Sequence, residues 1–521
     1  MRAQEQEHVR SADGETVGGG RSPVGTTSDG GRRTLRRLGL FVLAFASGFA
    51  VLTIEIAGAR MIAPVFGLSA VPWTAVIGVI LAALAVGSHL GGRLADRGTV
   101  PLALILTLAG VTAVLPVLGG EVPWVARDVL GFIPGAVASA VLLFAPSVLC
   151  LGAVVPFLVQ ADTESLGTVG RRAGDLSAAA TAGSIAGSFA TGFVLLPLVP
   201  LPTLMAVTAV MLFVMAALAG RLLVGRVSDG SLVMAALAVG AVTWISDRPA
   251  DSVVHREQTL YASVQVTERP WADGRRVREL WQNGGSSSAE YVDDGRPAHP
   301  YATASLDLLD DVLARAGSVL VLGGAALTLP VAFLERHPDL AVDVVEIDPA
   351  VTRIARTHFA AGKLPPDAMR VVHEDARVYL RATDRRYDVV YMDVFDHLLT
   401  VPWTMVTREA FAGMAARLEP GGLFVANVLS PLDGPGAAFL RRLRATLEDV
   451  FGETRFFLVT PEEDRRVTQN VIVVAGADEA TLPAWSGEKA SVPARGRAFT
   501  DEWAPVEYLQ ARVFMQGLGW D

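Results

Sequence analysis

Two aspartates follow an apolar stretch of the sequence at a spacing that suits amine chemistry. Residues 387–392 read YDVVYM, and Asp393 and Asp396 come after them, three residues apart. An amine is protonated near neutral pH, and a carboxylate can bind the ammonium group and take its proton as a general base. The second carboxylate can hold the remaining positive charge. Aspartate is also common in the turn after a strand, where it caps backbone N–H groups. The surrounding elements must decide between these interpretations.

Three other predicted strands end in glycine or in an acid. The stretch SVLVLGG ends in Gly323 and Gly324, AVDVVEID contains Glu346 near its end, and MRVVHEDA contains Asp375. Because predicted helices alternate with these strands, we expect a parallel sheet covered on both faces. Ligands of such sheets bind beyond the carboxyl ends of the strands. The sequence therefore predicts one ligand site at this edge, next to the two aspartates.

The order of these residues favours a ligand of the adenosine type. Gly323 and Gly324 let a ligand approach the backbone closely. Glu346 follows at the spacing of ~20 residues at which an acid accepts ribose hydroxyls in dinucleotide-binding folds. Asp375 can accept the exocyclic amine of adenine and can also cap the following helix. Because GGAALTLP lacks the third glycine of the dinucleotide fingerprint and the lysine of a P-loop, we expect a nucleoside thioether or sulfonium, such as S-adenosylmethionine or a relative.

The elements that would position these residues form an α/β domain. Helices are predicted in VAFLERH, PAVTRIARTHFA, TREAFAGMAARLEP and GAAFLRRLRATLEDVF. Pro349 opens the second of them at a first helical position, which suits its fixed φ. The stretches RFFLVT and QNVIVVAG close the series as strands. Before the sheet, LYASVQVTE and RRVRELWQN are predicted to form a small β-hairpin region with a turn at RPWADG.

The N-terminal half has the composition of a membrane domain. The chain of 521 residues is 51% hydrophobic, with a mean hydropathy of +0.41. Residues 1–37 are rich in Gly, Ser, Thr, Arg and Glu, and we expect a disordered tail there. Residues 38–246 are expected to form a transmembrane domain. It would contain about seven helices of ~20 residues each, at 38–58, 73–92, 100–119, 135–159, 176–197, 202–220 and 231–246.

A few residues of the predicted membrane domain have expected partners. Glu55 lies inside the first span, and we expect it to form a structural ion pair with Arg60. Cys150 is the only cysteine and lies in an apolar run, so it is expected to be a small core residue. A single cysteine cannot form an internal disulfide or a cysteine-based zinc site. Two glycine pairs suit close helix contacts, although glycine is frequent in membrane helices: Gly87 with Gly91, and Gly183 with Gly187.

The C-terminal half resembles a known family. Over roughly residues 255–480, VLVLGGAALTLPVAFLERHPDLAVDVVEIDPAVTRIAR, VVHEDARVYL, YDVVYMDVFDH and FAGMAARLEPGGLFVANV look like the polyamine aminopropyltransferases, the spermidine synthases. EIAGARMIAPVFG and GGRLADR are similar to the membrane region fused to some bacterial members. The resemblance implies a Rossmann-like, methyltransferase-type parallel sheet. It also implies transfer of an aminopropyl group from decarboxylated S-adenosylmethionine (or S-adenosylmethionine) as co-substrate to an amine such as putrescine, giving spermidine, with no tightly bound cofactor.

The resemblance also implies roles for the residues named above. Asp393 matches the general base, and Asp393 and Asp396 together match the amine-binding pair. Glu346 matches the ribose binder. The full set of implied nucleoside-binding residues is Gly323, Gly324, Glu346, Asp375 and Ala376.

Several positions depart from the pattern of the family. Its glycine loop reads Gly-Gly-Gly-Asp-Gly, and the Asp binds the cationic aminopropyl end of the donor. Here Ala325 and Ala326 stand at the third Gly and the Asp, and Ala262 stands where Gln usually follows Tyr in the first strand. Because these are donor and amine contacts, two other functions stay open: a methyltransferase that uses S-adenosylmethionine, and a membrane transporter or sensor whose soluble domain binds a nucleoside or polyamine without turnover. The other departures are Ser287 for Gln, Ala302-Thr303 for a polar pair, and Pro402 near the usual loop proline.

The charge pattern bears on the partners. The formal net charge is −9, and the C-terminal half has no basic stripe, so no nucleic acid is expected to bind. We expect a lipid bilayer and a small amine as partners and no metal site. A homo-oligomer is compatible with the sequence.

Arginines are distributed unevenly over the predicted loops. The tail and the even-numbered loops carry most of them, and the odd loops carry Arg60 and Arg127. The positive-inside rule puts the N-terminus in the cytoplasm, and seven spans would carry the C-terminal half outside. Because the implied donor is cytosolic, we expect instead that the synthase-like domain (255–485) and the C-terminal extension (486–521) face the cytoplasm from a multi-pass cell-membrane protein. The arginines concerned are Arg32, Arg33, Arg36, Arg37, Arg93, Arg97, Arg171, Arg172, Arg221 and Arg226.

Overall fold

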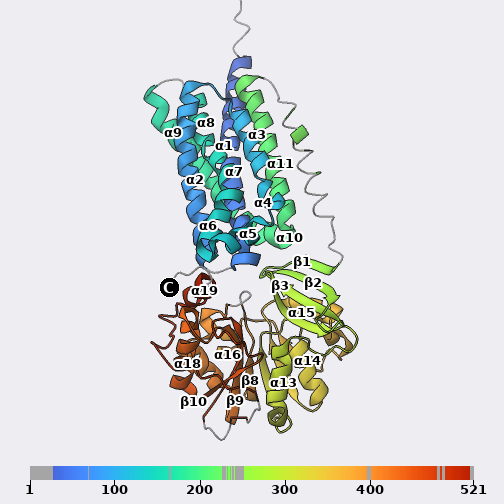
Figure 1. Ribbon diagram of the computed structural model, residues 1–521. Helices are drawn as coiled ribbons and strands as arrows, with labels where there is room; N and C mark the ends of the chain where they lie inside the picture. The colour runs from blue at the N-terminus through green and yellow to red at the C-terminus, as the bar shows by residue number, and fades with distance from the viewer. Residues whose placement is uncertain are drawn as a thin grey trace, which may run out of the picture.

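The computed structural model stacks a helical bundle on an α/β domain (Figure 1). The bundle comprises residues 27–225 and the α/β domain comprises residues 252–516. The structure describes residues 27–67, 70–163, 166–225, 230, 233–234, 236, 240, 252–395, 400–477, 482–483 and 487–516.

Long apolar helices make up the bundle. Five stretches of the described residues are long and apolar enough to cross a membrane, or up to six if a bent pair counts as one span. The five are Thr34–Phe66, Ala70–Arg97, Ala145–Asp162, Val169–Leu195 and Leu201–Val224, and the bent pair is Leu102–Leu118 with Val122–Leu130, at 71°. The helices are α1 (Thr27–Phe66), α2 (Ala70–Arg97), α3 (Leu102–Thr112), α4 (Leu115–Leu118), α5 (Val122–Leu130), α6 (Phe132–Leu143), α7 (Ala145–Gly152), α8 (Val154–Asp162), α9 (Val169–Phe189) with η2 (Ala190–Leu195), α10 (Leu196–Leu198), and α11 (Leu201–Ala219) with η3 (Gly220–Val224).

Two of the predicted spans differ from these helices. The span expected at 135–159 is divided between α6, α7 and α8, and Pro146 at the start of α7 lacks the N–H that would continue α6. The span expected at 100–119 is α3 and α4, which bend into α5. Helix α1 begins at Thr27, inside the predicted tail of residues 1–37. The seventh predicted span, 231–246, lies mostly outside the described residues, as do residues 1–26.

Close helix contacts in the bundle require glycine. A Cβ at Gly183 would collide with the backbone of Phe45 on α1, and one at Gly87 would collide with the backbone of Leu149 on α7. The predicted glycine faces therefore lie at helix contacts. Gly187 and Gly91 pack in the same way against Phe49 and Ala153.

The ion pair expected between Glu55 and Arg60 does not form among the described residues. Arg60 instead donates a hydrogen bond of 2.8 Å from Nη2 to the carbonyl oxygen of Leu260, in the α/β domain. Arg60 lies near the end of α1, within reach of the other domain, and this tertiary contact replaces the local one.

The α/β domain contains two sheets. The smaller sheet has the order β1-β2-β3-β4 and is antiparallel. It includes both predicted hairpin strands, as β2 and β3, and adds a strand on each side. Its strands are β1 (Val253–Gln258), β2 (Ser263–Pro270), β3 (Arg276–Gln282) and β4 (Gly285–Tyr291).

The larger sheet has seven strands in the order β10-β11-β9-β8-β5-β6-β7. The pairs from β9 through β7 are parallel, whereas β10 and β11 are antiparallel additions at one edge. The parallel sheet is therefore confirmed, with this antiparallel edge added. The strands are β5 (Ser318–Leu322), β6 (Ala341–Val345), β7 (Arg370–Val372), β8 (Tyr387–Met392), β9 (Leu418–Ser430), β10 (Glu453–Leu458) and β11 (Gln469–Gly476).

Helices cover both faces of this sheet. One face packs on α13 and α14, and the other packs on α16, α17 and α18. The helices are α13 (Pro300–Leu313), α14 (Thr328–Arg336), α15 (Pro349–His358), α16 (Ala376–Ala382), α17 (Arg408–Ala415), α18 (Ala438–Phe451) and α19 (Val506–Gln516).

The strand order places the chain reversal between β5 and β8. The chain passes from β5 to β6 on one side and from β8 to β9 on the other, so the carboxyl ends of β5 and β8 flank the switch point where ligands of such sheets bind. The N–H of Asp393 donates to the carbonyl of Leu322 at 2.9 Å. Gly323 has φ +91°, and a Cβ there would collide with the carbonyl of Asp393. Glycine is therefore required where the two strand ends meet.

Candidate functional site

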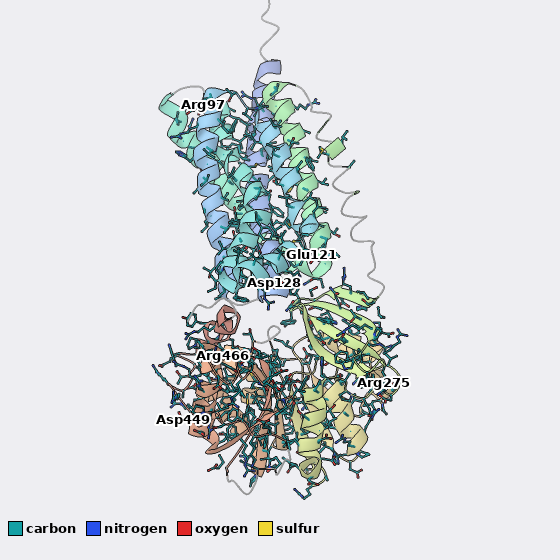
Figure 2. All side chains as sticks on the ribbon, in the orientation of Figure 1. Arg97, Glu121, Asp128, Arg275, Asp449 and Arg466 are labelled. Carbon is teal, nitrogen blue, oxygen red and sulfur yellow. The ribbon has the colours of Figure 1, made fainter. Side chains whose placement is uncertain are left out.

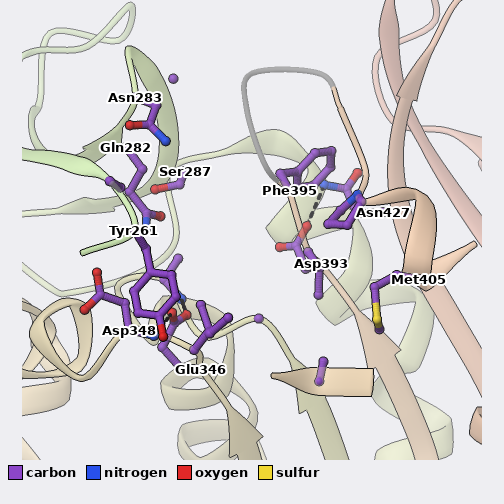
Figure 3. Close-up of a pocket in the computed structure, with 18 of the residues that line it drawn as sticks. Tyr261, Gln282, Asn283, Ser287, Glu346, Asp348, Asp393, Phe395, Met405 and Asn427 are labelled. Carbon is purple, nitrogen blue, oxygen red and sulfur yellow. Dashed lines mark hydrogen bonds between the residues drawn. The ribbon is translucent and has the colours of Figure 1, made fainter. Parts of the chain in front are cut away.

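A cavity of about 600 Å³ lies beyond the carboxyl ends of these strands (Figure 3). Most of the residues predicted from the sequence line it. Gly324 lies in a small adjoining cavity. Asp396 lies outside the described residues. The predicted residues that line the main cavity are Gly323, Glu346, Asp375, Ala376 and Asp393.

Asp393 is held by hydrogen bonds from neighbouring elements. Its Oδ1 accepts a hydrogen bond of 3.0 Å from Nδ2 of Asn427, drawn as a dashed line in Figure 3. Asn427 in turn accepts one of 2.9 Å from Asn470. These amides come from β9 and β11, and the register of β9 beside β8 brings Asn427 next to Asp393. The hydroxyl of Tyr301, at the start of α13, also donates to the carboxylate.

The surroundings of Asp393 adjust its basicity. Burial raises the pKa of the Asp393 carboxyl to about 6, while the hydrogen bonds from Asn427 and Tyr301 act to lower it. At neutral pH the group is therefore mostly ionised, yet it binds a proton more strongly than a free aspartate. A general base works best when its pKa lies near the working pH. Asp393 meets that condition.

Glu346 ties together the loop after β5 and the start of α15. Its Oε2 accepts hydrogen bonds from the N–H groups of Gly324 and Ala325, at 2.9 and 3.0 Å, and its Oε1 accepts from Asp348 at 2.9 Å. Burial raises the pKa of Glu346, and these backbone bonds act to lower it. A carboxylate has about four acceptor sites, so a site remains for a ligand. Glu346 thus shapes the loop as well as facing the cavity.

Asp375 combines the two roles weighed for it from the sequence. Its Oδ1 accepts a hydrogen bond of 3.0 Å from the N–H of Val378 and so caps α16. Asp375 also lines the cavity, together with Ala376. Capping fixes the carboxylate at the edge where an adenine ring would lie.

The loop after β5 has an unusual backbone for its sequence. Ala325 and Leu327 have φ values of 41° and 60°, which costs ~1–2 kcal/mol for a residue with a side chain. Ala326, between them, is buried and packs in one apolar cluster with Ala262 and Val264. Ala262 and Ala326, which replace polar residues of the family pattern, therefore belong to one apolar cluster.

The cavity favours cations. The described residues that line it include no lysine or arginine. Burial lowers the pKa of His299, which also lines it, so this imidazole is neutral at pH 7. Its acidic lining residues are Glu346, Asp348, Glu374, Asp375, Asp393 and Glu507.

Sequence reasoning missed several residues of the cavity. Asn427 could have been identified from the sequence, because its polar amide interrupts the apolar run of β9. The sequence indicates Tyr301 and Asn470 more weakly, since each lies beside an element boundary. No strand or helix pattern indicates Glu507 and Trp403, because tertiary packing brings them to the cavity.

Comparisons with known proteins identify relatives of this chain. Residues 309–460 match the family described as the spermine/spermidine synthase domain. The polyamine aminopropyltransferase of Mycobacterium tuberculosis (strain H37Rv) is 29% identical over 388 residues, covering 69% of this chain and 73% of the relative. Polyamine aminopropyltransferase 1 of Streptomyces coelicolor is 26% identical over 443 residues, covering 78% and 77%. The Vibrio vulnificus polyamine aminopropyltransferase is 29% identical over 228 residues, covering 42% and 72%.

The two longer alignments exceed the α/β domain. That domain is about half of the chain, so the alignments include part of the helical bundle. This is consistent with a fused form of the family. Among solved structures, a probable spermidine synthase from Corynebacterium glutamicum matches with a TM-score of 0.37 and 22% identity, covering 44% of this chain and 82% of that chain.

Proposed function

Because the chain belongs to the polyamine aminopropyltransferase (spermidine synthase) family and is a transferase, we propose that it transfers an aminopropyl group from decarboxylated S-adenosylmethionine to an amine such as putrescine. The acceptor nitrogen attacks the aminopropyl carbon bound to the sulfonium sulfur. The carbon–sulfur bond breaks, and its electron pair stays on sulfur as neutral methylthioadenosine. Asp393 takes the proton that the amine releases. Asp396 is proposed to bind the amine with it.

The observation that carries this proposal is the environment of Asp393. Its carboxyl, with a pKa of about 6, lies in a cavity lined by acids and, among the described residues, by no lysine or arginine. Both proposed substrates are cations, and both are attracted to such a site. Glu346, Asp375 and Ala376 are proposed to bind the nucleoside on the other side of the switch point.

A second candidate within the same fold is a methyltransferase. The presence of Ala262 and Ala326 in one apolar cluster favours it, because neither alanine can bind the amino group of an aminopropyl donor. S-Adenosylmethionine in that position would transfer its methyl group and leave S-adenosylhomocysteine.

One experiment separates the candidates. Full-length protein in detergent is incubated with putrescine and with each labelled donor in turn. A polyamine together with methylthioadenosine supports aminopropyl transfer, and S-adenosylhomocysteine supports methyl transfer. Binding of either donor without product would support the transporter or sensor alternative and contradict both.

We also propose that the bundle lies in a lipid bilayer, for which the five apolar helices are the support. The side of the membrane on which the α/β domain lies is a separate question. Figure 2 shows Arg97 at the end of the bundle far from that domain and Glu121 and Asp128 at the near end. Helix α11 runs from the near end of the bundle, beside α10, toward the far end, and strand β1 lies at the near end (Figure 1). By the positive-inside rule the far-end arginines favour a non-cytoplasmic α/β domain. We propose the cytoplasmic side instead, because the proposed donor is cytosolic.

Cysteine labelling tests this orientation. In a Cys150→Ala background, Glu462→Cys exposes a thiol on the α/β domain and Thr99→Cys exposes one at the far end of the bundle. Because the proposed donor is cytosolic, we expect a membrane-impermeant maleimide applied to intact cells to label the second variant alone. Labelling of the first variant alone would place the α/β domain outside, as the arginines suggest, and would contradict the proposed aminopropyl transfer.

A further inference from the structure

The end of α1 touches the rim of the cavity at two places. Arg60 donates its hydrogen bond to Leu260, directly before the cavity-lining Tyr261. Gly284, in the turn between β3 and β4, lies so close to the carbonyl of Pro64 that a Cβ there would collide with it. The bundle therefore supports two loops of the small sheet that border the cavity.

Helix α2 makes a third contact, with Glu507 of α19. The backbone N–H of Ala70, the first residue of α2, donates a hydrogen bond of 2.8 Å to Oε2 of Glu507. This N–H has no partner within its own helix, and the helix dipole favours a negative charge at this end. The carboxylate of Glu507 is thus held in place by the bundle. Its charge is not cancelled, because the donor is neutral.

Glu507 separates two cavities. It lines the main cavity and also a second cavity of about 410 Å³ between the start of α2 and the C-terminal segment. Trp403 likewise lines both. The two cavities therefore adjoin along these side chains. Asp501, another acid of the second cavity, is bonded to Arg377 at 2.7 Å, so its charge is compensated.

We propose that Glu507 binds an ammonium group of a linear polyamine acceptor that lies beyond the reach of a diamine such as putrescine, and that the second cavity receives the rest of the chain. This rests on the proposed aminopropyl transfer, in which Asp393 serves the reacting nitrogen. Two carboxylates, one at the end of β8 and one at the boundary of the second cavity, then face two nitrogens of one acceptor. The bundle acts as a positioning element, since α2 orients Glu507.

Direct binding in the absence of a donor, when no turnover can occur, tests this inference. Full-length protein with Asp393 intact is titrated with putrescine and with spermine in a calorimeter. Glu507→Gln removes the charge but keeps an oxygen that can accept from Ala70. We expect spermine affinity to fall about tenfold or more, as for loss of a hydrogen bond to a charged group, and putrescine affinity to change less than twofold. Glu462→Gln, at an exposed site of the same domain, is the matched control and should change neither.

A further variant isolates the contribution of the bundle. Ala70→Pro removes the N–H donor at a first helical position, where proline is tolerated. We expect this variant to bind spermine more weakly than the wild type, although Glu507 keeps its charge, because the carboxylate is no longer held in place.

The outcomes distinguish the two proposals. Equal spermine affinity with and without the charge of Glu507 would overturn this inference and leave aminopropyl transfer standing. An equal loss for putrescine and spermine would overturn the preference for a long acceptor. If neither amine binds in any variant, both proposals are wrong.

Discussion

Replacing Asp393 by asparagine should remove turnover and stabilise the fold at the same time. Asparagine keeps the shape of the side chain and can accept the hydrogen bond from Asn427 through its Oδ1. It cannot take a proton from an amine, and a general base contributes typically ~10²–10⁴-fold to a rate. We expect kcat to fall by that factor while nucleoside binding persists.

The stability change follows from the raised pKa of Asp393. Folding lifts this pKa from 3.8 to about 6, so the folded state binds this proton more tightly than the unfolded chain does. The fold therefore loses stability as pH rises from about 4 to 6, and the loss is complete at pH 7. A rise of this size in the pKa corresponds to about 3 kcal/mol of unfolding free energy as an upper bound. Asparagine avoids this cost, so the variant should melt at a higher temperature than the wild type at pH 7 and show no gain near pH 4.

The assay combines product formation with thermal unfolding of the full-length protein. Wild-type kcat/KM should fall tenfold per pH unit below about pH 6, where Asp393 becomes protonated. Asp388→Asn is the matched control on the same strand. Asp388 accepts from the N–H groups of Gly317 and Ser318 at the opposite end of β8, so this change should lower stability and leave turnover per folded molecule unchanged. Wild-type turnover in Asp393→Asn would refute the assignment of the base.

Three further substitutions probe the site and its support. Glu346→Gln should weaken nucleoside binding by about 1.5–3 kcal/mol, as for a lost hydrogen bond to a charged group; an unchanged calorimetric affinity would show that Glu346 acts only on the loop. Asp375→Ser keeps a capping side chain but is shorter, so adenosine should bind more weakly without a fall in melting temperature; a fall in stability alone would leave the cap as the role of Asp375. Gly284→Ala should raise hydrogen exchange on both sides of its contact with Pro64, because Gly284 has φ +81° and no space for a Cβ. Gly274→Ala is the control: Gly274 has φ +83° and nothing within 4 Å of an added Cβ, so this change imposes the backbone strain without a collision. Equal effects of the two changes on hydrogen exchange would refute the contact between Gly284 and Pro64 as the cause.

The sequence predicted the elements that local pattern determines. Apolar runs such as 387–392 are long enough to mark buried strands, and the helix that begins at Pro349 follows from proline's fixed φ. Because the carboxyl ends of parallel strands share one edge, the predicted residues could be brought together without any knowledge of distances. This is why Gly323, Glu346 and Asp393 fall in one cavity.

The sequence could not predict features that tertiary contacts decide. Glu507 reaches the cavity because α19 packs beneath the bundle. The residue pattern of its own segment does not predict this packing. Arg60 bonds to a carbonyl two hundred residues away in the chain instead of to the nearby Glu55. The left-handed backbone at Ala325 is likewise imposed by the fold, since Glu346 holds the N–H of that residue.

The bond between Ala70 and Glu507 joins positions 437 residues apart in the chain, which has a consequence for biosynthesis. Translation proceeds at about 5–20 residues per second, so α2 waits at least tens of seconds for its partner. During that interval the N–H groups at its first turn must be satisfied by water or lipid headgroups. The rim of the cavity is therefore completed only after α19 has left the ribosome. A chain released before α19 could assemble both sheets and still lack the wall that Glu507 provides.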